Sequence, residues 1–491
     1  MRKAFFLIPA LFIAFYFFHS AGLGLRADFS HDDLMNMNWS LARSYPDNLK
    51  DLVLFWRPTP TYRPVGALVY KVSLDLAGLN LFPLRVFCYI LMSLNLFLLY
   101  AVARRLSGSR EIAVLAALLC AYHRGLSGLY FNNGTLYDIL CFFFTFAALL
   151  FYIRARQAGR PLSPVSLCGF CFLCLLALNS KEMALAVPFF VGFYELLYHP
   201  PAGLSAKQAL AWLRQTAPGP AVSALIAAIY YFGRITGPDG VASSGAYNFH
   251  VSLAEYLKQT GHYVGDTFYK VGWFTPPKTT VFLLVLFGLA WLFRSRLLGF
   301  SAAFFATGIL PLAFISPRGL NAAYIPVAGL AVFCAGVLVM SRDVFLGLVA
   351  KRLGHETGGQ ARSGVTPREV LLFALVAYCL IRIHPDMSIQ YDSWQVEYGQ
   401  IRSFMGQLER LHPTMPKGAR ILIVKDPFGE YLWAGRFIVS LVYRNPDLRV
   451  VRLESAEKKP AAAEVAEYYA RLSYEDGRLR DLSPAEVPLG P

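Results

Sequence analysis

Long apolar runs recur along almost the whole chain and decide what it can fold into. Each is about 17–22 residues long, enough for a helix to cross roughly 30 Å of hydrocarbon. Only 16% of the 491 residues are charged and 56% are hydrophobic, so a soluble protein of this length would lack charged surface. The sequence therefore predicts an α-helical polytopic membrane protein with about eleven spans. We expect these spans at 4–20, 84–103, 111–129, 135–153, 163–180, 182–199, 217–233, 279–294, 297–315, 322–340 and 368–384.

The first apolar run follows the short basic start Met-Arg-Lys and has two interpretations. A cleaved signal peptide would need a small-x-small cleavage site, and no clear one occurs before Arg26. The run is also long for a signal peptide. We therefore expect it to remain as the first membrane helix, with cleavage as the alternative.

Positive charge alternates between successive loops and predicts the orientation of the chain. Arginine and lysine concentrate in the loops of one side, which the positive-inside rule assigns to the cytoplasm, and the short loops of the other side hold few. We expect a cytoplasmic N-terminus and a C-terminal domain on the outer side. The basic inner loops favour a bacterial inner (plasma) membrane with this domain in the periplasm, and the lumen of the endoplasmic reticulum is the alternative. The basic loops carry Arg104, Arg105, Arg110, Arg154, Arg156, Arg160, Lys207, Arg214, Arg294, Arg296, Arg342, Lys351, Arg352, Arg362 and Arg368.

The formal net charge of +15 follows partly from these loops. It indicates contact with the anionic headgroups of a lipid bilayer, and we expect no nucleic-acid partner. All eight cysteines lie within the apolar runs, which argues against a disulfide framework. The spacing of Cys168, Cys171 and Cys174 is metal-like, but small polarizable residues at every third position favour helix packing.

The pattern divides the chain into a membrane domain at 1–384 and a soluble α/β domain at 385–491. Two longer outer loops, 21–83 and 234–278, have apolar residues at helical spacing between charges, which predicts amphipathic helices along the membrane surface. In the tail, "ARILIVKDP" and "DLRVVRLE" predict strands, "AAAEVAEYYARLS" predicts a helix and "YEDGRLRDL" a hairpin with an Asp-Gly turn. We interpret the tail as a stability or docking module rather than a catalytic domain.

Ionisable residues gather at the outer ends of spans that are far apart in sequence. A charge near the middle of a membrane costs about 2.5–3.5 kcal/mol, so such residues normally avoid spans unless they are paired or used. Each alone is consistent with an interfacial anchor or an ion pair, but together they predict a polar cavity at the outer rim. The residues are Asp32, Asp33, Asp138, Lys181, Glu182, Arg318 and Tyr324.

The chemistry of these groups is complementary. A carboxylate can accept the proton of a hydroxyl as that hydroxyl attacks. Arginine and lysine can neutralise a departing phosphate. Glycosyl transfer from a lipid-linked phosphosugar requires both.

The order of the motifs resembles the GT-C superfamily of polytopic glycosyltransferases, nearest its protein O-mannosyltransferase-like branch. The motifs are the acidic pair in the first outer loop, "YRPV" before the second span, "NSKEMALAVPFFVGFYELL" and "SPRGLNAAYIPVAGL". The resemblance covers roughly residues 1–340 and implies a groove that holds a polyprenyl-phosphate sugar donor. It departs from the family in two respects: no His-Pro-Asp-like signature follows in the second loop, and the tail shows no β-trefoil pattern.

The resemblance implies roles for the catalytic and phosphate-binding residues. The base would be Asp32 or Asp33, with a slight preference for Asp33. Lys181 and Arg318 would hold the donor phosphate, and Arg63 would join them or contact a lipid headgroup instead.

The resemblance also implies roles on the acceptor side. Glu182 would orient Lys181 or the acceptor, Asp138 would bind the acceptor or a divalent metal, and Tyr324 would stand beside Arg318. His31 would tune the acid pair or lie in solvent. No strong metal-ligand cluster is present, so no metal is assigned and a divalent ion stays open.

The sequence thus predicts an integral membrane glycosyltransferase of GT-C type, transferring a hexosyl or pentosyl group to an acceptor hydroxyl on the extracytoplasmic face. The acceptor, whether protein, lipid or glycan, stays open, as does the sugar. The alternatives are a flippase or transporter of polyprenyl-linked sugars and a non-catalytic membrane scaffold. Matched Gly- or Pro-broken helices in two repeated halves, typical of transporters, are not found in the sequence.

Overall fold

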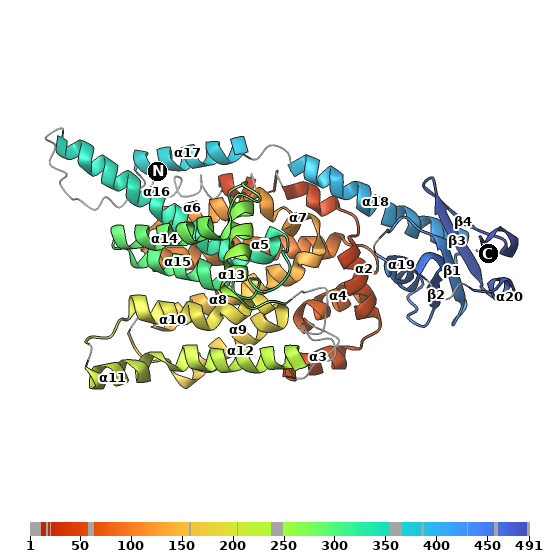
Figure 1. The fold of residues 1–491 in the computed structure, drawn as a ribbon, viewed down its shortest axis with the longest axis horizontal. Helices are drawn as coiled ribbons and strands as arrows, with labels where there is room; N and C mark the ends of the chain where they lie inside the picture. Colours follow the sequence, from red (N-terminus) through yellow and green to blue (C-terminus); the bar gives the residue numbers. More distant parts are fainter. Residues whose placement is uncertain are drawn as a thin grey trace.

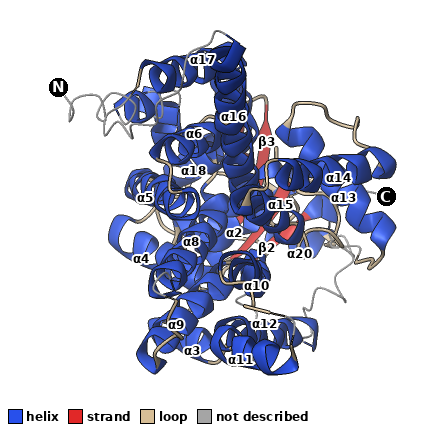
Figure 2. Ribbon diagram, turned by 90° about the vertical axis from the view of Figure 1, so that its left-hand side faces the viewer, coloured by secondary structure: helices blue, strands red, loops and turns tan. Residues whose placement is uncertain are grey.

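A computed structural model gives the fold of most of the chain. The structure describes residues 11–15, 18–19, 21–56, 63–156, 159–203, 205–236, 249–352, 366–383, 387–429, 431–455 and 460–488. Most helices run along the long axis of the molecule, and the strands lie together at the end that carries the C-terminus (Figure 1). Viewed along that axis, the helices are seen nearly end-on (Figure 2).

Three helices of the described residues are long and apolar enough to cross a membrane. They belong to α5 (Phe82–Ser107), α8 (Leu136–Arg156, preceded by η3) and α16 (Tyr324–Arg352, preceded by η5). A fourth candidate is α6 (Arg110–Ala121) together with Arg124–Phe131, two pieces bent by 60° at the break between them. The predicted helical membrane class is therefore confirmed.

Shorter helices lie at most of the other predicted spans. The predicted number of eleven is not established by length and composition, and the expected span 4–20 lies largely outside the described residues. These helices are α9 (Pro164–Ser180), α10 (Val187–Tyr198), α12 (Pro218–Thr236), α14 (Pro276–Leu292), α15 (Arg296–Gly308) and α17 (Pro367–Ile383).

The core of the bundle is built around α8 and α16. α8 packs against α5 and α9, and α16 packs against α6 and α15. Phe142 on α8 stacks on Phe146 and on Tyr324 with ring centroids 4.1 Å apart in each pair. Aromatic stacking of this kind fixes the helices relative to one another, so the polar ends of α8 and α16 keep a defined place.

Short helices cover the end of the bundle nearest the strands. They begin with caps that the sequence supplies: Ser30 caps α2 (His31–Leu41), and Ser252 caps α13 (Leu253–Thr267). α3 (Tyr45–Val53) and α4 (Pro64–Ala77) complete the first outer segment. The predicted amphipathic helices in both outer segments are thus present. The remaining helix between spans is α11 (Ala206–Thr216).

The C-terminal part begins with α18 (Met387–Leu411) and contains a four-stranded sheet in the order β2-β1-β3-β4. β1 (Arg420–Lys425) pairs in parallel with β2 (Arg449–Arg452) and β3 (Ala470–Glu475), and β4 (Arg478–Asp481) is antiparallel to β3. α19 (Ala434–Val442) lies between β1 and β2 in the chain. The predicted small α/β sheet region is confirmed.

Two turns of the tail test the sequence patterns directly. Asp476 and Gly477 both have positive φ, 47° and 76°, which is the two-residue hairpin turn expected from Asp-Gly. The helix predicted over 461–473 is wrong beyond its first part, because α20 ends at Ala466 (Ala462–Ala466). Ala470 and Leu472 instead bury alternate side chains in β3, and pairing with β1 outweighs the local helix preference.

Candidate functional site

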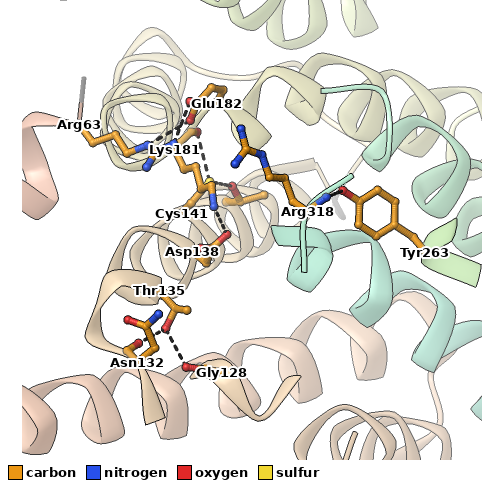
Figure 3. Close-up of polar contacts among 11 residues, drawn as sticks. Arg63, Gly128, Asn132, Thr135, Asp138, Cys141, Lys181, Glu182, Tyr263 and Arg318 are labelled. Atoms are coloured by element: carbon orange, nitrogen blue, oxygen red, sulfur yellow. Dashed lines mark hydrogen bonds and ion pairs between the residues drawn. The ribbon is translucent and has the colours of Figure 1, made fainter. Parts of the chain in front are cut away.

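A cavity of about 900 Å³ opens where α2, α4, α8, α12 and the segment before α16 meet. Its wall brings together residues that lie far apart in the sequence. The predicted site residues on this wall are Asp32, Arg63, Asp138, Lys181, Glu182 and Arg318. Figure 3 shows several of these side chains pointing toward one another from different elements.

Lys181 and Asp138 form an ion pair at the centre of this cavity. The distance from Lys181 Nζ to Asp138 Oδ1 is 2.6 Å, and the Asp138 side chain is nearly buried in the first turn of α8. Lys181 lies between α9 and η4 (Glu182–Ala186) in extended backbone, φ −165° and ψ 152°. This break in the helical run turns the lysine side chain back toward α8.

Arg63 and Glu182 form a second, bidentate pair on the same wall. The distances are 3.2 Å from Arg63 Nε to Glu182 Oε2 and 3.0 Å from Nη2 to Oε1. Arg63 also lies over the ring of Tyr137, 5.1 Å from its centroid. A planar guanidinium held by a carboxylate fork and an aromatic face has a fixed orientation. Arg63 is therefore a fixed feature of the cavity wall.

The two adjacent acids have different surroundings. Asp33 is fully buried: its carboxylate accepts hydrogen bonds from Ser30 N at 2.9 Å, Ser30 Oγ at 2.8 Å and Tyr70 OH at 3.1 Å. This is a helix capping box, and burial, opposed by Arg85, raises the pKa of Asp33. Asp33 therefore lies behind the cavity wall.

Asp32 lies on the cavity wall and is held by residues 132–134, just before α8. Asn132 Nδ2 donates to Asp32 Oδ2 at 3.3 Å, while Asn132 Oδ1 accepts from Ser30 Oγ at 2.9 Å and from Gly134 N at 2.7 Å. Gly134 also approaches Asp32 so closely that a Cβ there would lie 2.5 Å from Oδ2. The Asp32 carboxylate is thus the acid of the pair that a substrate in the cavity can reach.

Besides Asp33, two predicted site residues lie away from the cavity wall. His31 stacks on Tyr431 of the C-terminal region, with ring centroids 3.7 Å apart. Tyr324 is buried within the bundle on Phe142. Neither is among the residues that line the cavity.

Arg318 reaches the cavity from an exposed segment before η5 (Leu320–Ala323). Its backbone N–H donates to Tyr263 OH at 3.3 Å, and its carbonyl oxygen contacts His262 Nε2 at 3.2 Å, so α13 holds the segment from outside. The side chain extends toward the region of Lys181 and Glu182 (Figure 3).

Arg234 and Tyr230 also line the cavity and were missed from the sequence. Arg234 donates to Tyr230 OH from Nη2 at 2.7 Å and from Nε at 3.1 Å. The sequence holds a signal: an arginine follows the apolar run of α12 at the end expected to face outward, where the positive-inside rule does not call for one.

Apolar residues also line the cavity. They come from α10, α12, the segment before α13 and the segment that follows α15. They include Phe189, Ala227, Ala228, Tyr231, Phe249, Leu310, Leu312, Phe314 and Ile315. The cavity therefore offers both charged groups and hydrocarbon contacts.

Within the described part of the chain, no group of three or more His, Cys, Asp or Glu side chains is placed to hold a metal ion.

Residues 58–231 match the sequence model of a family described as dolichyl-phosphate-mannose-protein mannosyltransferase. The matched segment contains Arg63, Asp138, Lys181 and Glu182 of the cavity wall. The resemblance to the GT-C superfamily that the sequence motifs indicate is thereby confirmed.

Among solved structures, the chain is similar to ArnT from Cupriavidus metallidurans. The apo structure is 14% identical and the match covers 91% of this chain and 86% of that one, with a TM-score of 0.46. The structure bound to undecaprenyl phosphate is 13% identical, with coverage of 93% and 87% and a TM-score of 0.49. No curated protein sequence matches the chain.

Proposed function

We propose that the protein is an integral membrane glycosyltransferase that transfers a sugar from a polyprenyl-phosphate-linked donor to an acceptor hydroxyl. The observation that carries the proposal is the composition of one cavity: a reachable carboxylate, a group of cations and an apolar wall share a space of about 900 Å³. The family match over 58–231 supports the same class of reaction.

The proposed reaction is a direct displacement at the anomeric carbon. Asp32 takes the proton of the acceptor hydroxyl as its oxygen attacks. The bond from the anomeric carbon to the phosphate oxygen breaks, and polyprenyl phosphate leaves with the bonding electrons. We choose Asp32 over Asp33 because Asp33 is buried in its capping box. Asn132 holds the Asp32 carboxylate in place.

The cations are proposed to bind the phosphate and stabilise its developing charge. Arg318 and Arg234 contribute exposed or half-buried guanidiniums, and Lys181 and Arg63 stand nearby in their ion pairs. Asp138 and Glu182 hold the two paired cations in fixed positions before the donor arrives. Charges oriented in advance need little reorganisation during the reaction.

The apolar wall is proposed to contact the isoprenoid chain. Phe189, Tyr231 and Phe314 line the same cavity as the charged groups and supply aromatic surface for a branched hydrocarbon. A donor in this position would put its phosphate among the cations and its sugar toward Asp32.

The setting of this reaction is part of the proposal. We place the protein in a bacterial inner membrane, with residues 1–384 as the catalytic membrane domain and the cavity on the periplasmic side. Residues 385–491 would form an outer domain that contacts α2 through His31. The acceptor would be a protein, lipid or glycan at that face.

The test is transfer of radiolabelled sugar by the purified protein from membrane-extracted polyprenyl-phosphate donors. We expect Asp32→Asn to lower the turnover about 10²–10⁴-fold, the usual contribution of a general base. Asp75→Asn, which removes an exposed acid of α4 that pairs with Lys71 and does not line the cavity, is the matched control and should transfer at the wild-type rate.

The same assay separates the alternatives. Full turnover by Asp32→Asn would remove Asp32 as the base. Absence of transfer from every donor, together with movement of labelled donor across vesicle membranes, would favour a flippase. Absence of both would favour a scaffold.

A further inference from the structure

A second cavity, of about 450 Å³, lies at the opposite end of the bundle, between the last turns of α5 and α8. These two helices pack side by side (Figure 2). α8 begins with Asp138 at the first cavity and ends near Arg154 at the second. Sixteen residues of helix separate the two, which corresponds to roughly 24 Å along the axis. The second cavity is therefore on the other side of the apolar layer.

Three arginines dominate the wall of this second cavity: Arg104, Arg105 and Arg154. Among the described residues that line it, there is no carboxylate. Gly108, with φ 68°, follows the last residue of α5 and also lines the cavity. As a glycine, it adds no side chain to the space beside the arginines. Like charges brought together in this way repel unless an anion lies among them.

The hydrogen bonding of Arg104 differs from that of two other arginines of the bundle, Arg85 and Arg156. Arg85 donates to the backbone carbonyl oxygens of Ala27, Asp28 and Phe131, and Arg156 donates to both oxygens of Glu195. Arg104 Nη1, by contrast, is buried and has no hydrogen-bond acceptor among the described residues. A buried charged donor without an acceptor is unfavourable, so this nitrogen indicates a ligand with acceptor oxygens.

The apolar part of the wall indicates where that ligand comes from. Tyr100 and Phe97 precede Arg104 on α5 by about one and two turns, toward the middle of the apolar helix. The Phe97 side chain is 62% exposed and faces outward from the bundle. A molecule among the arginines would thus touch hydrocarbon-facing aromatic surface on the membrane side.

We propose that this second cavity binds the phosphate headgroup of an anionic membrane lipid. Arg104 and Arg154 donate to the phosphate oxygens, and the acyl chains lie along Phe97. The shared chemistry, a phosphate among guanidiniums, also fits free inorganic phosphate, and the apolar wall favours the lipid. The inference is independent of the reaction proposed for the first cavity.

The competing explanation is the general attraction of basic loops to an anionic bilayer, which needs no site. The two explanations differ in what a pair of substitutions should do. Lipid binding at a defined site depends on the arginines that line it. Lipid binding by general electrostatic attraction depends only on the number of positive charges at that end of the bundle.

The test is binding of labelled phosphatidylglycerol to the full-length protein in neutral detergent micelles, with the bound lipid counted by mass spectrometry of the intact complex. We expect one tightly held phosphatidylglycerol, with weaker retention of phosphatidylcholine. Arg104→Gln/Arg154→Gln should weaken the binding about tenfold or more. Lys207→Gln/Arg214→Gln removes the same charge from α11 without touching the cavity and should bind like the wild type.

Three outcomes would overturn the inference. Equal losses of lipid binding in the two double variants would leave the general electrostatic attraction of the basic loops as the explanation. Wild-type binding by Arg104→Gln/Arg154→Gln would exclude this cavity. Displacement of the lipid by millimolar inorganic phosphate would assign the cavity to the free anion. If the double variant fails to fold, the single variant Arg154→Gln at an exposed position gives the same comparison with Arg214→Gln.

Discussion

At the scale of single residues, the contact between Gly134 and Asp32 is the tightest constraint on the proposed base. A Cβ at residue 134 would lie 2.5 Å from Asp32 Oδ2, far inside van der Waals contact. The Asp32 Cβ would lie 2.4 Å from the added methyl, so rotation of the carboxylate alone cannot relieve the contact, and Asp32 must shift relative to residues 132–135. A methyl group at residue 134 would therefore displace the carboxylate.

We expect Gly134→Ala to lower sugar transfer at least tenfold in protein that still folds. A misplaced reacting group costs rate even when its chemistry is unchanged. Gly192→Ala is the matched control, because a Cβ there has no neighbour within 4 Å. Transfer by Gly134→Ala at the rate of the control would show that the Asp32 position is not critical.

The residue scale is also where sequence reasoning reached its limit. The pair Lys181–Glu182 was found because two charges interrupt an apolar run, but their partners Asp138 and Arg63 depend on how helices meet. The choice between the two acids had a local signal that was not used. Ser30 precedes Asp33 by three residues, the spacing of a capping box, which assigns Asp33 to the helix start.

At the scale of elements, α2 connects the cavity to the C-terminal region. His31 and Asp32 are neighbours on α2, yet one stacks on Tyr431 and the other lines the cavity. Phe428 and Trp433 meet the His31 ring edge-on, with centroids 6.2 Å away in each case. Burial among these rings lowers the pKa of His31, and the nearby Asp32 opposes this.

This arrangement predicts a pH-dependent contact. The neutral imidazole is the form favoured in the fold, so its contribution to stability is present above the unfolded pKa of about 6.5 and is lost as the pH falls through the lower folded pKa. His31→Phe keeps an aromatic ring and removes the titration. We expect the unfolding temperature of the wild type, relative to His31→Phe, to fall between about pH 6.5 and pH 5. A difference that stays constant from pH 8 to pH 5 would contradict this.

The sequence predicted the helices and turns correctly where a single physical influence dominated. Apolar length predicted α5, α8 and α16, and the Asp-Gly pair predicted the β3–β4 turn. The prediction failed where two influences compete. The Ala- and Glu-rich residues before 470 favour a helix, while the alternation of Ala470 and Leu472 suits a strand only when β1 is beside it.

At the scale of the whole molecule, buried and exposed ion pairs should contribute unequally to stability. Glu195 on α10 accepts from Arg156 Nε at 2.6 Å, from Arg156 Nη2 at 2.9 Å and from Tyr152 OH at 2.7 Å, and both charged side chains are only 2% exposed. The pair joins α8 to α10. Removing one partner leaves the other charge buried alone.

We expect Glu195→Ala to lower the free energy of unfolding by about 3–5 kcal/mol. Glu475→Ala, which breaks an exposed pair with Lys425, is the comparison and should cost less than about 1 kcal/mol. Denaturant unfolding in a fixed detergent measures both. Similar losses in the free energy of unfolding for the two variants would mean that the buried Arg156–Glu195 pair stabilises the protein no more than the exposed pair does.

The adjacent residues Lys181 and Glu182 link two separate parts of the fold. Lys181 is extended and Glu182 begins η4, and their side chains have different partners: Lys181 pairs with Asp138 in the first turn of α8, while Glu182 pairs with Arg63, which immediately precedes α4. The two adjacent residues thus join the segment 21–83 to the start of α8. Inserting a single residue between positions 181 and 182 would turn one of the two side chains away from its partner. The fact that the two residues are adjacent, more than the identity of either, would then limit which sequence changes are tolerated at these positions.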